Sequence, residues 1–215
     1  MRRHIVFILG AVISLSSCSK NDSGLVQTPV PEEKVTDYFP LTVGNYWVYQ
    51  LFRADTSMVP FPSGYFDSTY VEKDTVVNGK PFKKVTTHSY LFETWLLRDS
   101  ADFLVNELGQ RLFTHRQFTG TLYEYRPEFA TEFVVSAAMS QKDSTFIVPA
   151  GQFVSKYVIG SVTALGEVPA WQKRRSFSKA YSKNIGPVHR WAVWIGSPEY
   201  LEWRLVRYSV KNSAP

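Results

Sequence analysis

Cysteine, histidine and aspartate are the side chains of this sequence whose types and spacing could do chemistry. The chain has 215 residues, with one cysteine and four histidines. His4 belongs to an N-terminal apolar segment, and the remaining candidate bases or metal ligands are His88, His115 and His189. None of them stands in a G-x-S-x-G, H-E-x-x-H or phosphate-binding glycine motif. We therefore expect no metal site, no cofactor and no enzymatic activity.

The surroundings of these candidates favour structural roles. His115 and His189 alternate with apolar neighbours in predicted strands, so we expect both side chains to point to solvent. Asp99 and Asp102 flank a predicted tight turn, in which aspartate commonly bonds its own backbone. A hydrolase is a third and weaker hypothesis, because it would need a histidine, a serine and a carboxylate within hydrogen-bond reach in one cleft.

Cys18 is different, because its position predicts a covalent modification. Arg2 and Arg3 precede an apolar run over residues 5–15, and small residues follow before the cysteine. This order is typical of an export signal whose first mature residue is an acylated cysteine. The apolar run is too short for a membrane-spanning helix, which needs about 20 residues. Ordinary export with cleavage near residues 14–16 is the alternative.

Lipidation would place the mature protein on a membrane. We expect the signal peptide, residues 1–17, to be removed and Cys18 to carry acyl chains such as palmitate. Each buried methylene contributes about 0.8 kcal/mol, and two or three chains are enough for stable attachment. By resemblance to Gram-negative lipoproteins, Ser19 favours the outer membrane. The leaflet, periplasmic or surface-facing, stays open.

The rest of the chain divides into a tether and one domain. Residues 18–36 are rich in polar residues and proline, and predict a flexible tether that spans about 24 Å. Residues 37–215 are long enough for a single domain with its own core. Aromatic residues make up 15% of the sequence, which argues against disorder. The formal net charge is only +5 and includes the signal peptide, so we expect no nucleic-acid partner.

Apolar residues in the domain recur mostly with period two, which predicts an all-β, mainly antiparallel fold. The sheet would be a strongly curved meander, an open barrel or a sandwich. The dipeptide of Asn78 and Gly79 predicts a tight hairpin between residues 68–77 and 80–90, because both central residues take positive φ. Further strands are predicted at residues 46–52, 94–98, 103–107, 111–115, 145–148, 152–163, 176–182, 188–195 and 201–211.

Two segments depart from simple alternation. In residues 201–211 the apolar parity slips between Leu205 and Val206, which predicts a β-bulge or a strand buried on both faces. Residues 127–139 begin with Pro127 and Glu128 and continue with apolar residues near helical spacing, which favours a short helix. A strand through residues 133–135 is the alternative.

Several turn motifs carry a resemblance to a known family. Residues 38–49 read YFPLTVGNYWVY, residues 148–153 read VPAGQF and residues 184–188 read NIGPV. With the Asn-Gly hairpin, this order resembles the TapB-like proteins, a family of β-rich envelope lipoproteins. The resemblance implies a β-rich envelope lipoprotein and no established activity. Asn184 replaces the family's first glycine and Pro187 its usual apolar residue, so Pro187 should sit at a strand end.

Two segments are the best candidates for contact with a ligand. Residues 54–67 form a long apolar loop in this interpretation, with Phe61, Tyr65 and Phe66 as its aromatic residues. Such a loop either closes over the open end of the sheet and plugs the core, or acts as a binding lid.

The second segment is residues 164–176. Trp171 precedes Lys173, Arg174 and Arg175, so an aromatic ring and three cations could grip an anionic glycan or lipid headgroup. A solvated basic strand end is the alternative.

Together these observations predict a tethered all-β lipoprotein of the cell outer membrane. We expect it to bind or scaffold an envelope glycan, lipid or protein without catalysis. The alternative is a carrier of a lipid or acyl chain inside the curved sheet. A connected apolar cavity of about 300 Å³ or more would favour the carrier, and a filled interior would favour the scaffold.

Overall fold

The protein is an all-β molecule, as predicted, built around one antiparallel sheet. The computed structural model describes residues 32–88 and 93–211. The strands are β1 (Tyr46–Ala54), β2 (Phe61–Val77), β3 (Lys80–His88), β4 (Glu93–Ser100), β5 (Phe103–Asn106), β6 (Arg111–Thr114), β7 (Thr121–Tyr125), β8 (Phe133–Met139), β9 (Ser144–Val148), β10 (Gly151–Ala164), β11 (Arg174–Ser182), β12 (Gly186–Val193) and β13 (Tyr200–Ser209).

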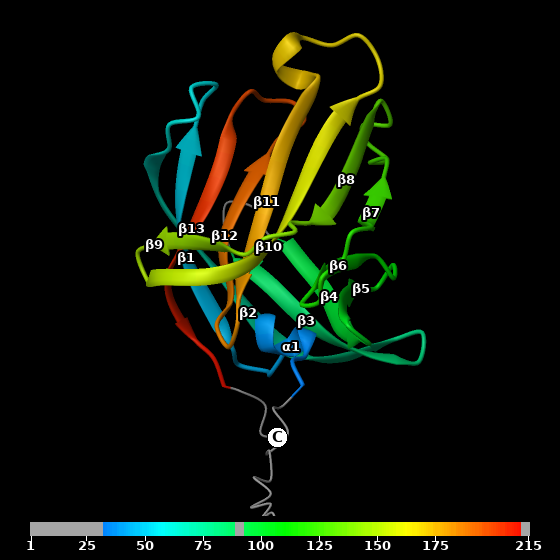
Figure 1. The fold of residues 1–215 in the computed structure, drawn as a ribbon, viewed down its shortest axis with the longest axis vertical. Coiled ribbons are helices and arrows are strands. Elements are labelled where there is room, and N and C mark those ends of the chain that lie inside the picture. The colour runs from blue at the N-terminus through cyan, green and yellow to red at the C-terminus, as the bar shows by residue number, and fades with distance from the viewer. Residues whose placement is uncertain (1–31, 89–92, 212–215) are drawn as a thin grey trace, which may run out of the picture. The chain divides into compact units, whose positions relative to one another are not determined.

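The sheet curves into a nearly closed barrel (Figure 1). Its described strands follow the order β6-β5-β4-β3-β2-β1-β13-β12-β11-β10-β8-β7, and β9 pairs with β10 beside this path. Neighbouring strands are antiparallel throughout this order. The two end strands, β6 and β7, approach each other across a seam. The seam lacks the paired register that joins the other neighbours of the described sheet.

Turn chemistry explains how β2 returns as β3. Asn78 and Gly79 have φ of 50° and 74°, which is the backbone that a two-residue hairpin of this type requires. Val77 lies opposite Lys80 in the register. The predicted Asn-Gly hairpin is confirmed.

A bulge interrupts the pairing between β1 and β13. Val48 lies opposite Arg207 and Tyr49 lies opposite Leu205, so Val206 is one residue too many. The extra residue brings Tyr208 opposite Trp47, on the same face as Leu205 opposite Tyr49, although the parity changes after Leu205. The predicted bulge is therefore confirmed at this position.

The helix predicted for residues 127–139 is wrong, and the alternative, a strand, is correct. A turn closed by hydrogen bonds from Ala130 N to Pro127 O and from Phe133 N to Ala130 O leads directly into β8. Buried and half-buried residues alternate strictly along Phe133–Met139. Period two therefore fits this segment better than the helical spacing, and pairing with β10 satisfies its backbone. The preceding strand, β7, was not predicted.

The compact domain includes residues that were predicted as the end of the tether, up to residue 36. A short helix, α1 (Val35–Tyr38), buries Val35 completely. Just before it, Glu33 forms an ion pair with Lys183 at 2.7 Å, and Asn184 N donates to Asp37 O. The boundary moves because Val35 is an apolar residue that the core can bury. Cys18 and the remaining residues of the predicted signal and tether lie outside the described residues.

Aromatic side chains fill the end of the barrel next to α1. Trp47 is fully buried, and its Nε1 donates a hydrogen bond of 2.6 Å to Ile185 O. Gly186 has a φ of +104°, and a Cβ at this position would lie 2.8 Å from the Trp47 ring. The ring centroids of Phe113 and Tyr181, which belong to the same buried cluster as Trp47, lie 4.5 Å apart. The core therefore closes this end of the barrel.

Candidate functional site

The barrel interior contains a groove of about 500 Å³. Residues of β4, β7, β8, β10, β11, β12 and β13 line it, together with residues of the turns that follow β7 and β12. The groove continues inward into a smaller cavity of about 100 Å³. Both spaces share Glu93, Trp95, Lys179, Arg190 and Trp203, which form the floor of the groove. Its aromatic wall residues are Tyr123, Tyr125, Phe129, Phe177, Trp191 and Trp194.

A glycine in β10 makes room for one wall of the groove. Gly160 lies opposite Phe177 of β11, and a Cβ on Gly160 would lie 2.0 Å from Phe177 Cζ. The Phe177 ring therefore packs directly against the β10 backbone. A larger residue at position 160 would displace this ring, which lines the groove.

The floor of the groove contains a half-buried ion pair. Arg190 of β12 donates to both carboxylate oxygens of Glu93 of β4, at 3.1 and 3.3 Å. Trp95 Nε1 also donates to Glu93, and the Arg190 guanidinium lies 4.6 Å from the Trp203 ring centroid. Burial raises the pKa of Glu93, but the Arg190 charge and its hydrogen bonds outweigh this and hold the pKa below its ordinary value. The pair is therefore charged at neutral pH.

Lys179 is the second cation of the floor. Its Nζ lies 4.8 Å from the Trp95 ring centroid. Within residues 32–88 and 93–211, Lys179 forms no ion pair with a carboxylate. Burial, helped by the nearby charge of Arg190, lowers the pKa of Lys179 to about 8.

Arg175 orders the loop between β12 and β13. The guanidinium donates to the backbone carbonyls of Trp194, Ser197, Pro198 and Glu199. It also lies 4.1 Å from the Tyr200 ring centroid, and the residue is only 4% exposed. Its donors are therefore used inside the protein, and they fix a loop that borders the groove.

The predicted basic patch is consequently split. Lys173 and Arg174 are exposed, whereas Arg175 points into the protein. Trp171 lies in a short 3₁₀ helix, η1 (Ala170–Gln172), with its ring 5.7 Å from the Arg175 guanidinium. The sequence pattern missed this separation because successive residues of a strand point to opposite faces. Anion binding by Lys173, Arg174 and Trp171 stays a prediction.

The apolar segment predicted as a loop over residues 54–67 is mostly strand. Only residues 55–60 separate β1 from β2. Phe61, Tyr65 and Phe66 lie in β2 and are 53–59% exposed, so they do not plug the core. Gly64, with a φ of +83°, and a shift of register opposite β1 let the strand continue through this segment. Ligand binding by the three aromatic residues stays a prediction.

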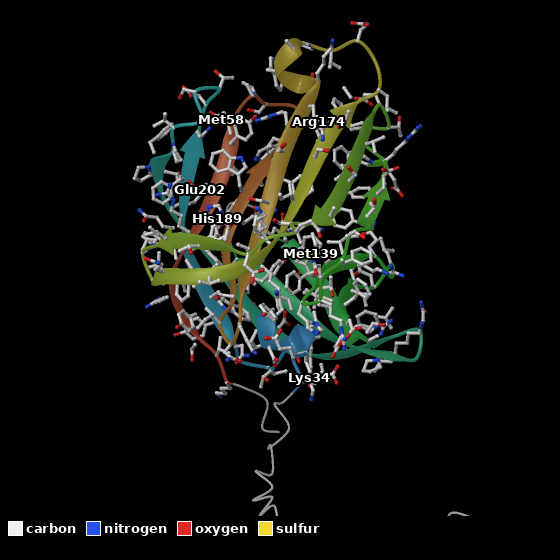
Figure 2. The ribbon with its side chains drawn as sticks, in the orientation of Figure 1. Lys34, Met58, Met139, Arg174, His189 and Glu202 are labelled. Atoms are coloured by element: carbon white, nitrogen blue, oxygen red, sulfur yellow. The ribbon has the colours of Figure 1, made fainter. Side chains whose placement is uncertain are left out.

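Of the two histidines expected to face solvent, His115 is buried and His189 has a side chain that is only 13% exposed. His115 is 6% exposed and stacks on Tyr38. His189 Nε2 lies 2.7 Å from Glu202 Oε1, and Phe146 of β9 covers the imidazole. His189 and Glu202 are labelled in Figure 2. The expectation is wrong because Tyr38 of α1 packs on His115 and Phe146 of β9 packs on His189.

The buried histidine does not complete a hydrolase site. Glu202 is held between His189 and Arg204, whose guanidinium donates to Oε2 at 2.8 Å. His189 Nδ1 has no hydrogen-bond partner in the described residues, and no serine there bonds to this imidazole. Over the same residues, no group of three or more histidine, cysteine, aspartate or glutamate side chains could hold a metal ion.

Sequence reasoning missed Glu93, Lys179 and Arg190. A signal was present in β11, where Lys179 has the same parity as Phe177 and Tyr181. A charge among apolar residues of one parity indicates an inward-facing cation, but the carboxylate of Glu93 comes from a strand distant in sequence.

In the described part of the chain, no helix has the length and apolarity needed to cross a membrane.

Comparison with known proteins gives two similar solved structures. No family model and no curated protein matches this sequence, so the resemblance to TapB-like proteins stays a prediction. A candidate exported protein with a YmcC-like fold from Bacteroides fragilis is 11% identical, with a TM-score of 0.43 over 78% of this chain and 96% of that chain. A candidate lipoprotein from Parabacteroides distasonis is 12% identical, with a TM-score of 0.41 over 80% of this chain and 98% of that chain.

Proposed function

We propose that this protein is a lipid-anchored cell-envelope protein that binds an apolar or amphiphilic ligand in the groove of its barrel. The groove itself carries the proposal, because about 500 Å³ lies within the range of small-molecule sites. Its walls are mainly aromatic, which suits an apolar ligand, and the few charged groups lie at the floor. This arrangement favours the carrier over the scaffold with a filled interior.

Exposed apolar residues of the groove support ligand binding. Phe129 is 86% exposed, Tyr125 is 42% exposed and Trp194 is 38% exposed. Single exposed apolar residues are common, but these three line one groove. A ligand that entered the groove would remove their apolar surface from water.

Filling the groove is expected to weaken ligand binding without unfolding the protein. Ala192 lines the groove from β12, so Ala192→Trp should occupy much of its volume. We expect the affinity for N-phenyl-1-naphthylamine, a neutral apolar dye, to fall by about tenfold or more, which corresponds to about 1.4 kcal/mol. Dye fluorescence would be titrated on the mature chain carrying Cys18→Ser, purified without detergent.

The matched control is Val76→Trp. Val76 is 69% exposed on the β2–β3 hairpin and does not line the groove. This variant should bind the dye like the parent chain. Equal dye binding by a folded Ala192→Trp variant would reject the groove as the ligand site.

The membrane anchor is tested separately by Cys18→Ser. We expect the full-length parent chain to sediment with the outer membrane and the variant to stay in the soluble fraction. The variant lacks the acyl chains, each methylene of which would contribute about 0.8 kcal/mol to membrane binding. Cell fractionation and immunoblotting would measure the distribution. The neighbouring variant Ser23→Ala should behave like the parent. A Cys18→Ser chain that still sediments with the membrane would contradict acylation as the anchor.

A further inference from the structure

We propose that the ligand of the groove carries one anionic head, a carboxylate or a phosphate, which pairs with Lys179 at the floor while the apolar tail lies along the aromatic walls. This inference rests on the proposed function and names its ligand class. Lys179 lines both the groove and the smaller cavity beneath it. A head placed between these spaces would contact the ammonium directly.

The other charged groups of the floor already have partners. Arg190 uses two of its nitrogens on Glu93, and Glu93 also accepts from Trp95. Asp67, on the β2 side of the small cavity, accepts a hydrogen bond from the Trp203 indole. The described floor therefore has the Glu93–Arg190 ion pair, in which Arg190 Nε is left without a hydrogen-bond partner, and one additional cation, Lys179.

A lysine in such a place normally has an anionic partner. Lys179 is half-buried, and even partial removal of an ammonium from water is costly unless an anion compensates it. Lys179 has its ammonium over the Trp95 ring, which compensates only part of this loss. No carboxylate of the described residues lies within ion-pair distance of it, and the charge of Glu93 acts on it only from farther away. A ligand anion would supply the missing partner.

The charges around Lys179 also predict how binding depends on pH. Arg190 of β12 and Glu93 of β4 face Lys179, and Tyr123 of β7 lines the same groove. The pKa of Lys179 without ligand is about 8, and an adjacent anion raises it because the charged form is favoured. Anion affinity should therefore be full below pH 8 and decrease as the pH rises through this value. Binding of a neutral ligand should not follow this change.

The test compares four ligands that share one tail, each below its micelle concentration. Dodecanoate and dodecyl phosphate carry an anionic head, dodecan-1-ol is neutral and dodecyltrimethylammonium is cationic. Each would displace N-phenyl-1-naphthylamine from the mature chain carrying Cys18→Ser. We expect Lys179→Met to weaken binding of the two anions by about tenfold to 100-fold and to change dodecan-1-ol binding by less than about twofold. Lys179→Arg should retain the preference for anions.

The control variant is Lys80→Met, which removes an exposed lysine of β3 and should leave all affinities unchanged. If Lys179→Met does not fold, the parent chain at pH 7 and pH 9.5 replaces it, and dodecanoate but not dodecan-1-ol should bind more weakly at the higher pH. Comparing dodecanoate with dodecyl phosphate distinguishes a fatty acid from a phosphate head, and a preference for either supports the inference.

Two results would overturn the inference. If dodecan-1-ol binds as tightly as both anions and Lys179→Met changes nothing, the groove binds apolar ligands without a charged contact, and the proposed function survives. If neither the dye nor any of the four ligands binds the parent chain, the proposed function fails as well.

Discussion

Trp47→Ala is expected to lower the free energy of unfolding by about 3–5 kcal/mol, as is typical for removing a large buried aromatic residue. Trp47 is fully buried, and its ring lies 5.5 Å from the Phe39 ring. The substitution would leave a large cavity and remove the hydrogen bond to Ile185 O. Urea denaturation followed by circular dichroism would measure the loss.

Two further variants separate the causes of this loss. Trp47→Phe keeps an apolar ring but removes the indole donor, so it should cost less than Trp47→Ala. Tyr46→Ala changes the preceding residue of β1, which is 39% exposed, and should cost about 1 kcal/mol or less. If Trp47→Ala and Tyr46→Ala lowered the free energy of unfolding equally, Trp47 would not be a central residue of the core.

Arg175→Met is expected to cost about 3 kcal/mol and to release the loop between β12 and β13, because hydrogen bonds to a charged group contribute more than neutral ones. Four backbone carbonyls of residues 194–199 accept from this guanidinium. Methionine fills a similar length but donates to none of them. We expect amide hydrogen exchange of residues 195–199 to increase along with the loss of stability.

Arg174→Met is the matched control. It removes the same charge from an adjacent, exposed residue of β11, so stability should change by less than about 0.5 kcal/mol. Hydrogen exchange in the loop should stay as in the parent chain. Unchanged protection of residues 195–199 in Arg175→Met would mean that other contacts order this loop.

Local signals in the sequence were sufficient for much of the fold. The Asn78 and Gly79 turn could be predicted because its positive φ values are set by the two residues themselves. The bulge at Val206 could be predicted because the apolar pattern of one strand changes parity there. Both features depend on neighbours in sequence, so no knowledge of the tertiary structure was needed.

Features that depend on distant contacts could not be predicted in this way. His189 alternates with apolar residues along its strand, as many exposed strand residues do. It is covered because Phe146 of β9 packs on it. Residues 133–139 contain spacings compatible with both periods, and pairing with β10 decided for the strand. The groove floor joins Glu93 to Arg190 across 97 positions of sequence.

The seam between β6 and β7 has a consequence for the size of the ligand. In the part of the chain that the structure describes, no backbone pairing joins these two strands, so they can separate without breaking hydrogen bonds of the sheet. Tyr123 and Tyr125 belong to β7 and line the groove, which places one of its walls at this free edge. Moving β7 away from β6 costs less free energy than separating two strands that are joined by backbone hydrogen bonds. We therefore expect the groove to accept ligand tails of different widths, because a small outward movement of β7 would widen it.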